Sequence, residues 1–122
     1  MESAKVGVLM LLEAFVKEGF FGQDEVKQFM SEHFRSFAEE RLFKIRRPFL
    51  KCLITVSKHF SLEEISTHVF SVFKVYSQLS EVWGLRRYCL ELAPDLVQLL
   101  NPTDLPALRY VLEFLQNSLT KQ

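Results

Sequence analysis

The sequence predicts an all-α protein, a right-handed α-solenoid of three antiparallel helical hairpins with about six helices. Apolar residues recur at spacings of three and four along the chain, and no segment shows the sustained apolar–polar alternation of a strand. The chain also repeats itself, because residues 42–50 (LFKIRRPFL) are echoed by residues 82–90 (VWGLRRYCL), apolar on apolar and Arg-Arg on Arg-Arg. A period near forty residues is typical of stacked helical hairpins.

The apolar spacing predicts helices over residues 4–18, 23–39, 42–59, 62–79, 82–100 and 104–118. Gly19 can end the first helix, since glycine readily adopts the left-handed conformation found at helix C-termini. Ser61 opens a capping-box pattern before the fourth helix, and Asn101 or Thr103 is the predicted N-cap of the last. Short connections favour antiparallel neighbours, which gives hairpins 4–39, 42–79 and 82–118 within a single domain, 1–122.

The positions of the four prolines bear on the predicted helix boundaries. Pro102 and Pro106 fall in the first turns of the last helix, where a missing N–H costs little. Pro48 either starts the third helix or bends it. Pro94 lies inside the 82–100 pattern and predicts a kink, with a break at Ala93 as the alternative.

The composition of the chain excludes several classes of protein. The 122 residues are enough for one core, and 48% of them are apolar, which excludes a disordered chain. The 15 basic and 15 acidic residues cancel, which argues against a dedicated nucleic-acid binder. Cys52 and Cys89 sit in apolar patterns and are predicted to be buried free thiols in a reducing compartment. Residues 6–12 are too short an apolar run for a membrane span, so the predicted location is the cytoplasm, with the nucleus as alternative.

No group of residues predicts catalysis. The three histidines have no metal-ligand spacing to one another or to a cysteine, and the four glycines form no phosphate-binding loop. No serine or cysteine lies in a nucleophile motif. The sequence therefore predicts a protein that is not an enzyme and that uses no metal and no cofactor.

Residues 43–53 and 82–93 resemble the second helix of HEAT repeats, in which an apolar residue followed by Arg opens the helix, as in Ile45-Arg46 and Leu85-Arg86. Residues 81–87 (EVWGLRR) are most similar to repeats in the scaffold and regulatory subunits of protein phosphatases, and armadillo repeats are the alternative. The resemblance implies a non-catalytic protein–protein interaction module, an adaptor or regulatory subunit of a larger complex, with a phosphatase regulatory-type subunit as one form. A small enzyme is the weakest alternative.

The repeated arginines allow two interpretations. They can form a ladder in which each pairs with a carboxylate of the neighbouring repeat, which would be structural. They can instead form a basic ridge that holds an acidic peptide or phosphate groups, which would make the chain a phosphopeptide- or nucleic-acid-binding module. The ridge would consist of Lys44, Arg46, Arg47, Lys51, Arg86 and Arg87.

The two ends of the chain differ in pattern. Terminal helices of a solenoid are polar outside, and the last helix fits, with a predicted inward face of Leu105, Leu108, Val111, Leu112, Leu115 and Leu119. Its predicted outward face carries Arg109, Glu113, Gln116 and Asn117. The first helix is apolar on most sides, which predicts docking or self-association through a surface that includes Val8, Leu9 and Leu12. The alternative is that the third helix covers the first.

Overall fold

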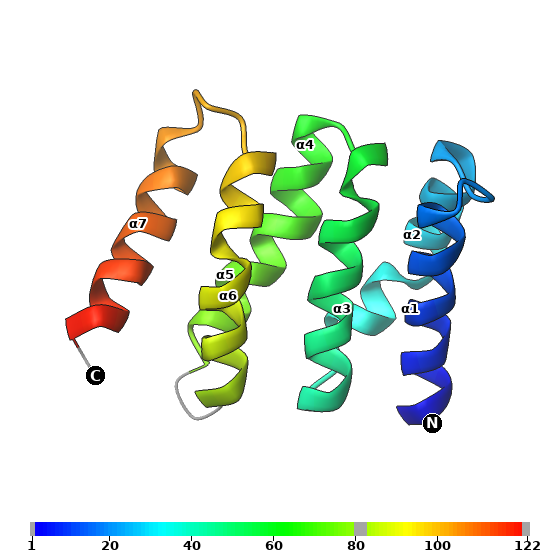
Figure 1. The fold of residues 1–122 in the computed structure, drawn as a ribbon, viewed down its shortest axis with the longest axis horizontal. Coiled ribbons are helices and arrows are strands. Elements are labelled where there is room, and N and C mark those ends of the chain that lie inside the picture. Colours follow the sequence, from blue (N-terminus) through cyan, green and yellow to red (C-terminus); the bar gives the residue numbers. More distant parts are fainter. Residues whose placement is uncertain (1, 80–82, 121–122) are drawn as a thin grey trace. The chain divides into compact units, whose positions relative to one another are not determined.

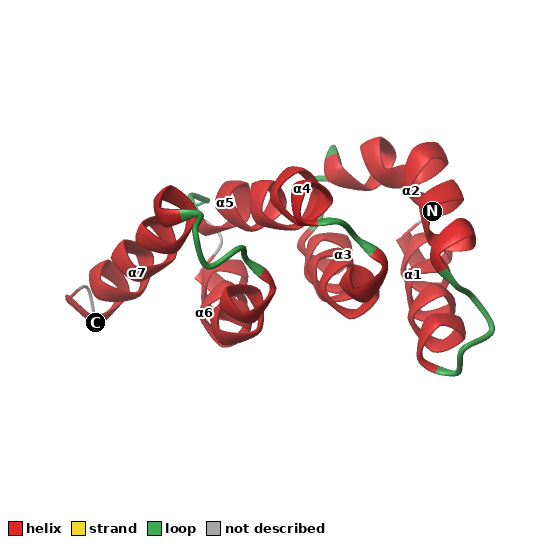
Figure 2. Cartoon of the chain, turned by 90° about the horizontal axis from the view of Figure 1, so that it is seen from above, coloured by secondary structure: helices red, strands yellow, loops and turns green. Residues whose placement is uncertain are grey.

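The computed structural model describes residues 2–79 and 83–120. These residues form six long helical segments and no strand, which confirms the predicted all-α class (Figure 2). The chain divides into two compact units, Met1–Ser61 and Leu62–Gln122. The predicted hairpin 42–79 has one helix in each unit, so the solenoid arrangement and the single domain 1–122 stay predictions.

The first unit contains α1 (Glu2–Lys17), α2 (Gln23–Ala38), α3 (Phe43–Val56) and the short 3₁₀ helix η1 (Ser57–His59). Both α1 and α2 pack against α3, and α1 lies alongside it in Figure 1. An aromatic cluster joins α2 to α3: the Phe49 ring stacks on Phe37, with ring centroids 5.4 Å apart, and lies 5.8 Å from Phe34. Phe suits this dry contact because its side chain has no polar atom to satisfy.

The second unit starts with α4 (Leu62–Glu64), η2 (Ile65–Phe70) and α5 (Ser71–Ser77), which follow one another without a break. The middle segment is a π-helix. Hydroxyl groups compete with amides for carbonyls here, since Thr67 Oγ1 donates to the carbonyl oxygen of Glu63 and Ser71 Oγ donates to that of Thr67. This competition is a local reason for the backbone to leave α geometry.

The unit is completed by α6 (Trp83–Leu99) and α7 (Leu105–Thr120), which pack against each other in Figure 1. Its core includes Phe73 from α5, Leu85 and Leu96 from α6, and Phe114 from α7, all buried. The Phe73 and Phe114 rings meet edge to face, with centroids 5.7 Å apart. Such a geometry brings the positive edge of one ring against the face of the other and adds to the gain from burial.

The predicted helix positions are confirmed to within a few residues at every end that the structure describes. Gly19 ends α1 with a positive φ of 79°, as predicted. Gly22 precedes α2, and its N–H donates to Glu25 Oε1 at 2.8 Å, as in half of a capping box. Pro48 lies inside α3, and α6 runs through Pro94 without the break considered at Ala93.

The start of α7 differs from the prediction. Asp104, and not Asn101 or Thr103, caps the helix: its Oδ1 accepts the N–H of Ala107 at 3.3 Å. Asn101 Oδ1 instead accepts the N–H of Thr103 at 3.0 Å, which closes the turn before the helix. Pro102 lies in that turn and only Pro106 lies inside the helix.

We expect the substitution Asp104→Ala to lower the free energy of unfolding by about 1 kcal/mol, because the first-turn amide of Ala107 loses its acceptor. Urea denaturation followed by circular dichroism measures the change. The control is Asp104→Asn, whose amide oxygen can accept the same bond and should keep most of the stability. Equal midpoints for Asp104→Ala and the natural chain would contradict the capping role.

Candidate functional site

The outward face of α1 is apolar and exposed. Val8, Leu11 and Phe15 follow one another at spacings of three and four, so they share one face, and they are 43%, 56% and 36% exposed. Met10 is also exposed, about a quarter turn around the helix from Leu11. This α1 face is the largest group of exposed apolar side chains that the first unit presents among its described residues.

The structure changes the membership of the predicted docking surface on this helix. Val8 is exposed as expected, but Leu9 and Leu12 are buried. The third helix does cover the inner side of α1, as the alternative proposed, and leaves the outer side uncovered. Leu11 and Phe15 replace Leu9 and Leu12 in the candidate surface, and whether the surface binds a partner stays a prediction.

The C-terminal turn of α1 extends the same face. Gly19 N–H donates to the carbonyl of Val16 at 3.1 Å, and Phe20 N–H donates to that of Phe15 at 2.8 Å. This pair of bonds is a Schellman motif, which brings the side chain after the glycine back onto the last turn. The Phe20 ring therefore meets Phe15 edge-on, with centroids 6.3 Å apart, and stays 71% exposed.

Polar contacts hold α1 in place on its inner side. Lys5 Nζ lies 2.7 Å from Glu40 Oε2, next to the end of α2. The hydrogen bond from Lys5 keeps the pKa of the Glu40 carboxyl below its usual value. Glu13 is buried, and its Oε2 accepts from Thr55 Oγ1 on α3 at 3.2 Å. These contacts fix the rotation of α1, so the apolar face stays directed outward.

The first arginine pair lies at the start of α3. Arg46 Nε donates to the carbonyl oxygen of Glu40 at 2.7 Å, which ties α3 to the segment after α2. Lys44, Arg47 and Lys51 of the predicted ridge are exposed on the same helix. This hydrogen bond of Arg46 goes to a backbone carbonyl, whereas the predicted ladder pairs arginine with a carboxylate.

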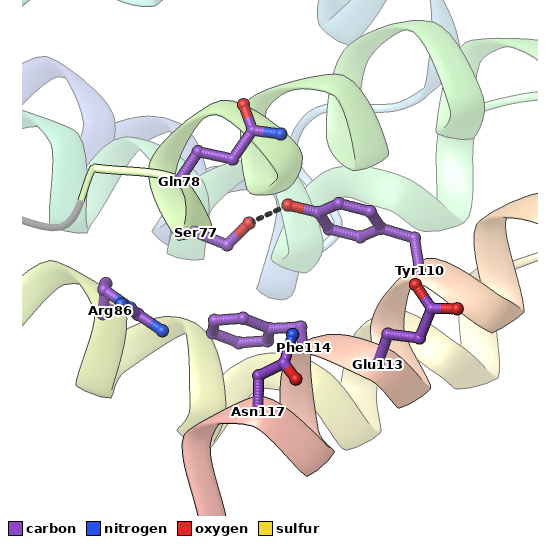
Figure 3. Close-up of a pocket in the computed structure, with 7 residues that line it drawn as sticks. All are labelled: Ser77, Gln78, Arg86, Tyr110, Glu113, Phe114 and Asn117. Atoms are coloured by element: carbon purple, nitrogen blue, oxygen red, sulfur yellow. Dashed lines mark hydrogen bonds between the residues drawn. The ribbon is translucent and has the colours of Figure 1, made fainter. Parts of the chain in front are cut away.

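The second arginine pair lies on α6. The Arg86 guanidinium sits over the Phe114 ring, 5.7 Å from its centroid, and Arg87 lies 3.7 Å from Glu91 one turn along the helix. Arg86 also lines a shallow pocket of about 330 Å³ (Figure 3). The other lining residues are Ser77, Gln78, Tyr110, Glu113, Phe114 and Asn117.

The groups in this pocket are mixed in charge. Glu113 places a carboxylate in the same pocket as Arg86, and the Ser77 and Tyr110 hydroxyls bond each other (Figure 3). A carboxylate in the same pocket disfavours a phosphate ligand, because the two negative charges repel each other. The two arginine pairs belong to different units, so one continuous basic ridge stays a prediction.

The last helix is turned differently from the prediction. Its buried residues are Ala107, Val111 and Phe114, whereas Leu105, Leu112 and Leu119 are 65%, 55% and 74% exposed. The predicted inward face was therefore wrong for these three leucines. Phe114 is larger than any leucine and buries more surface, which gives the stripe that contains it the stronger tendency to face the core. The predicted outward residues Arg109, Glu113, Gln116 and Asn117 are exposed, so the helix presents these polar side chains together with the three leucines.

The chemistry of the described side chains is limited. Among the residues that the structure places, no group of three or more His, Cys, Asp or Glu side chains could hold a metal ion. Cys52 and Cys89 are buried free thiols, as predicted, and burial raises the pKa of each to about 12. Within the described parts of the chain, no helix has the length and apolar character needed to cross a membrane.

The chain matches no protein-family model, no curated protein and no solved structure. The resemblance to HEAT repeats therefore depends on the two quoted segments alone and stays a prediction. Sequence reasoning missed Leu11, Phe15 and Phe20 on α1, although their spacing and the glycine at position 19 were visible. It also missed the outward leucines of the last helix, because it assigned them to the core.

Proposed function

We propose that this chain is a non-catalytic protein-binding module, built as a solenoid of HEAT-like or armadillo-like hairpins. It would serve as an adaptor or regulatory subunit of a larger complex, and a protein phosphatase is the complex that the sequence resemblance suggests. The observation that carries the proposal is the exposed apolar face of α1, which is formed by Val8, Leu11 and Phe15 and is continued by Phe20.

Physical chemistry supports a protein as the ligand of this face. Complete burial of one large apolar side chain contributes roughly 1.5–3 kcal/mol. Leu11 and Phe15 are 56% and 36% exposed, so a partner that covers both gains about that amount from the two together. Contiguous exposed apolar surface of this kind commonly marks interaction sites. The backbone groups of α1 are used within the helix, so recognition depends on side-chain packing, as when a helix lies in a groove.

The rigidity of α1 strengthens the case. Lys5 and Glu13 hold the helix to the rest of the first unit, and the Schellman motif fixes Phe20. A surface that is already ordered loses little conformational entropy when a partner binds. The α1 face therefore suits a stable partner more than a transient, loosely defined contact.

Affinity capture with matched variants tests the proposal. Leu11→Glu places a charge on the α1 face, and Leu62→Glu is the control, because Leu11 and Leu62 are 56% and 57% exposed. We expect the natural chain and Leu62→Glu to recover similar amounts of each partner from cell extract. We expect Leu11→Glu to recover at least about tenfold less. Recovery of a phosphatase catalytic subunit would support that form of the proposal. Identical recovery with Leu11→Glu would contradict a role for α1.

A further inference from the structure

Five leucines of α7 form a continuous line that we name the leucine seam. They are spaced three, four, three and four residues apart, which is the a and d spacing of a coiled-coil heptad. The first, third and fifth leucines are more than half exposed, and the second and fourth are partly exposed. The leucine seam consists of Leu105, Leu108, Leu112, Leu115 and Leu119.

One side of α7 is already used within the second unit. Ala107, Val111 and Phe114 are buried, and Tyr110 bonds Ser77 of α5. The leucine seam lies beside these contacts, and its leucines are apolar side chains of α7 that the second unit leaves fully or partly exposed. The leucines left exposed on α7 occupy only a and d positions, which is the pattern of a coiled-coil seam.

We propose that the leucine seam pairs with the leucine seam of a second copy of this chain, as a parallel, in-register two-helix coiled coil. The seam can serve as its own complement, because each leucine would meet the same leucine of the other copy. Five leucines exposed on average by about half present on the order of 400 Å² of apolar surface. Two such faces with their flanks bury on the order of 1,000 Å², the lower range of specific interfaces.

Charges beside the seam favour the parallel orientation. In a parallel pair a residue at position g lies next to the residue five places later in the other helix. This rule places Asp104 of each copy next to Arg109 of the other copy, so the dimer would contain two such pairs. Asp104 Oδ1 accepts from Ala107 N–H, and a carboxylate has a second oxygen that can accept from the arginine. An antiparallel pair with Leu105 opposite Leu115 would instead bring the two Arg109 side chains together.

Sedimentation of the full chain across micromolar concentrations gives the first test. We expect reversible dimers, and we expect Leu112→Glu to raise the dimer dissociation constant at least about hundredfold. Leu62→Glu is the control, since it adds the same charge at a leucine of similar exposure. A natural chain that stays monomeric throughout would overturn the proposal, as would a Leu112→Glu dimer of unchanged affinity.

Engineered thiols test the register without disturbing the fold. Leu112→Cys should form a disulfide between two copies under mild oxidation, because position 112 faces itself in the parallel pair. Cys52 and Cys89 are buried and should not react. Bridging only in a mixture of Leu108→Cys and Leu112→Cys chains would overturn the parallel register. A monomeric chain that still shows α1-dependent capture would overturn the dimer and leave the proposed function intact.

Discussion

The substitution Phe49→Ala is expected to lower the free energy of unfolding by about 3–5 kcal/mol. Phe49 is almost completely buried, and its ring contacts Phe37 and Phe34 at centroid distances of 5.4 and 5.8 Å. Its removal would leave a cavity at the contact between α2 and α3, which rigid helices cannot collapse to fill. Urea denaturation monitored by circular dichroism measures the loss.

The control for this prediction is Phe20→Ala. The same side chain is removed, but Phe20 is 71% exposed and touches Phe15 only at its edge. We expect a loss of no more than about 1 kcal/mol. A Phe49→Ala variant as stable as Phe20→Ala would show that the aromatic cluster does not hold the first unit together.

Helix positions were predictable because local signals specify them. The three-and-four spacing of apolar residues continues through each helix, and Gly19 marks an end that only a residue tolerant of positive φ adopts easily. The cap of α7 was harder to predict, since Asn101, Thr103 and Asp104 all carry suitable oxygens. The turn at Pro102 decides among them, because it uses the Asn101 side chain and leaves Asp104 at the helix start.

The direction of each helix face was not predictable in the same way. α7 carries two apolar stripes, one with Val111 and Phe114 and the other with the leucines, and spacing alone does not rank them. In α1 the run of apolar residues surrounds the axis, so Leu9 and Leu11 look equivalent in sequence although only Leu9 is buried. Tertiary packing decides such cases, because it depends on the shape and volume of the neighbouring helices.

The repeated arginines illustrate the same limit at the level of single side chains. Arg46 and Arg86 occupy equivalent places in the echo, yet one donates to a backbone carbonyl and the other covers an aromatic ring. A long, flexible side chain takes the partner that its surroundings offer, and Phe114 comes from a helix that the local motif does not contain. The two apolar surfaces on α1 and α7 therefore carry the functional proposals, and the arginines do not.

The two native thiols are expected to be nearly inert in the folded protein. Burial, with a smaller contribution from the Glu13 charge, raises the pKa of Cys52 to about 12, and burial raises that of Cys89 to about 12 against the opposing effect of Arg86. Compared with a thiol of ordinary pKa, the reactive thiolate at pH 8 should be about a thousandfold less abundant. A chromogenic thiol reagent should therefore react slowly with the two cysteines of the folded protein in buffer, and rapidly with those of the unfolded protein in urea.

The raised pKa values also give a direction for the pH dependence of stability. The folded chain holds the two thiol protons more tightly than the unfolded chain, so these groups leave stability unchanged below pH 9.0 and reduce it as pH rises from there toward about 12. The variants Cys52→Ala and Cys89→Ala show how much each thiol contributes. Each variant should lose less stability at alkaline pH than the natural chain, and its remaining cysteine should still react slowly. A native thiol that reacts as fast as an exposed one would identify an open site, and would contradict the packing of the helix that carries it.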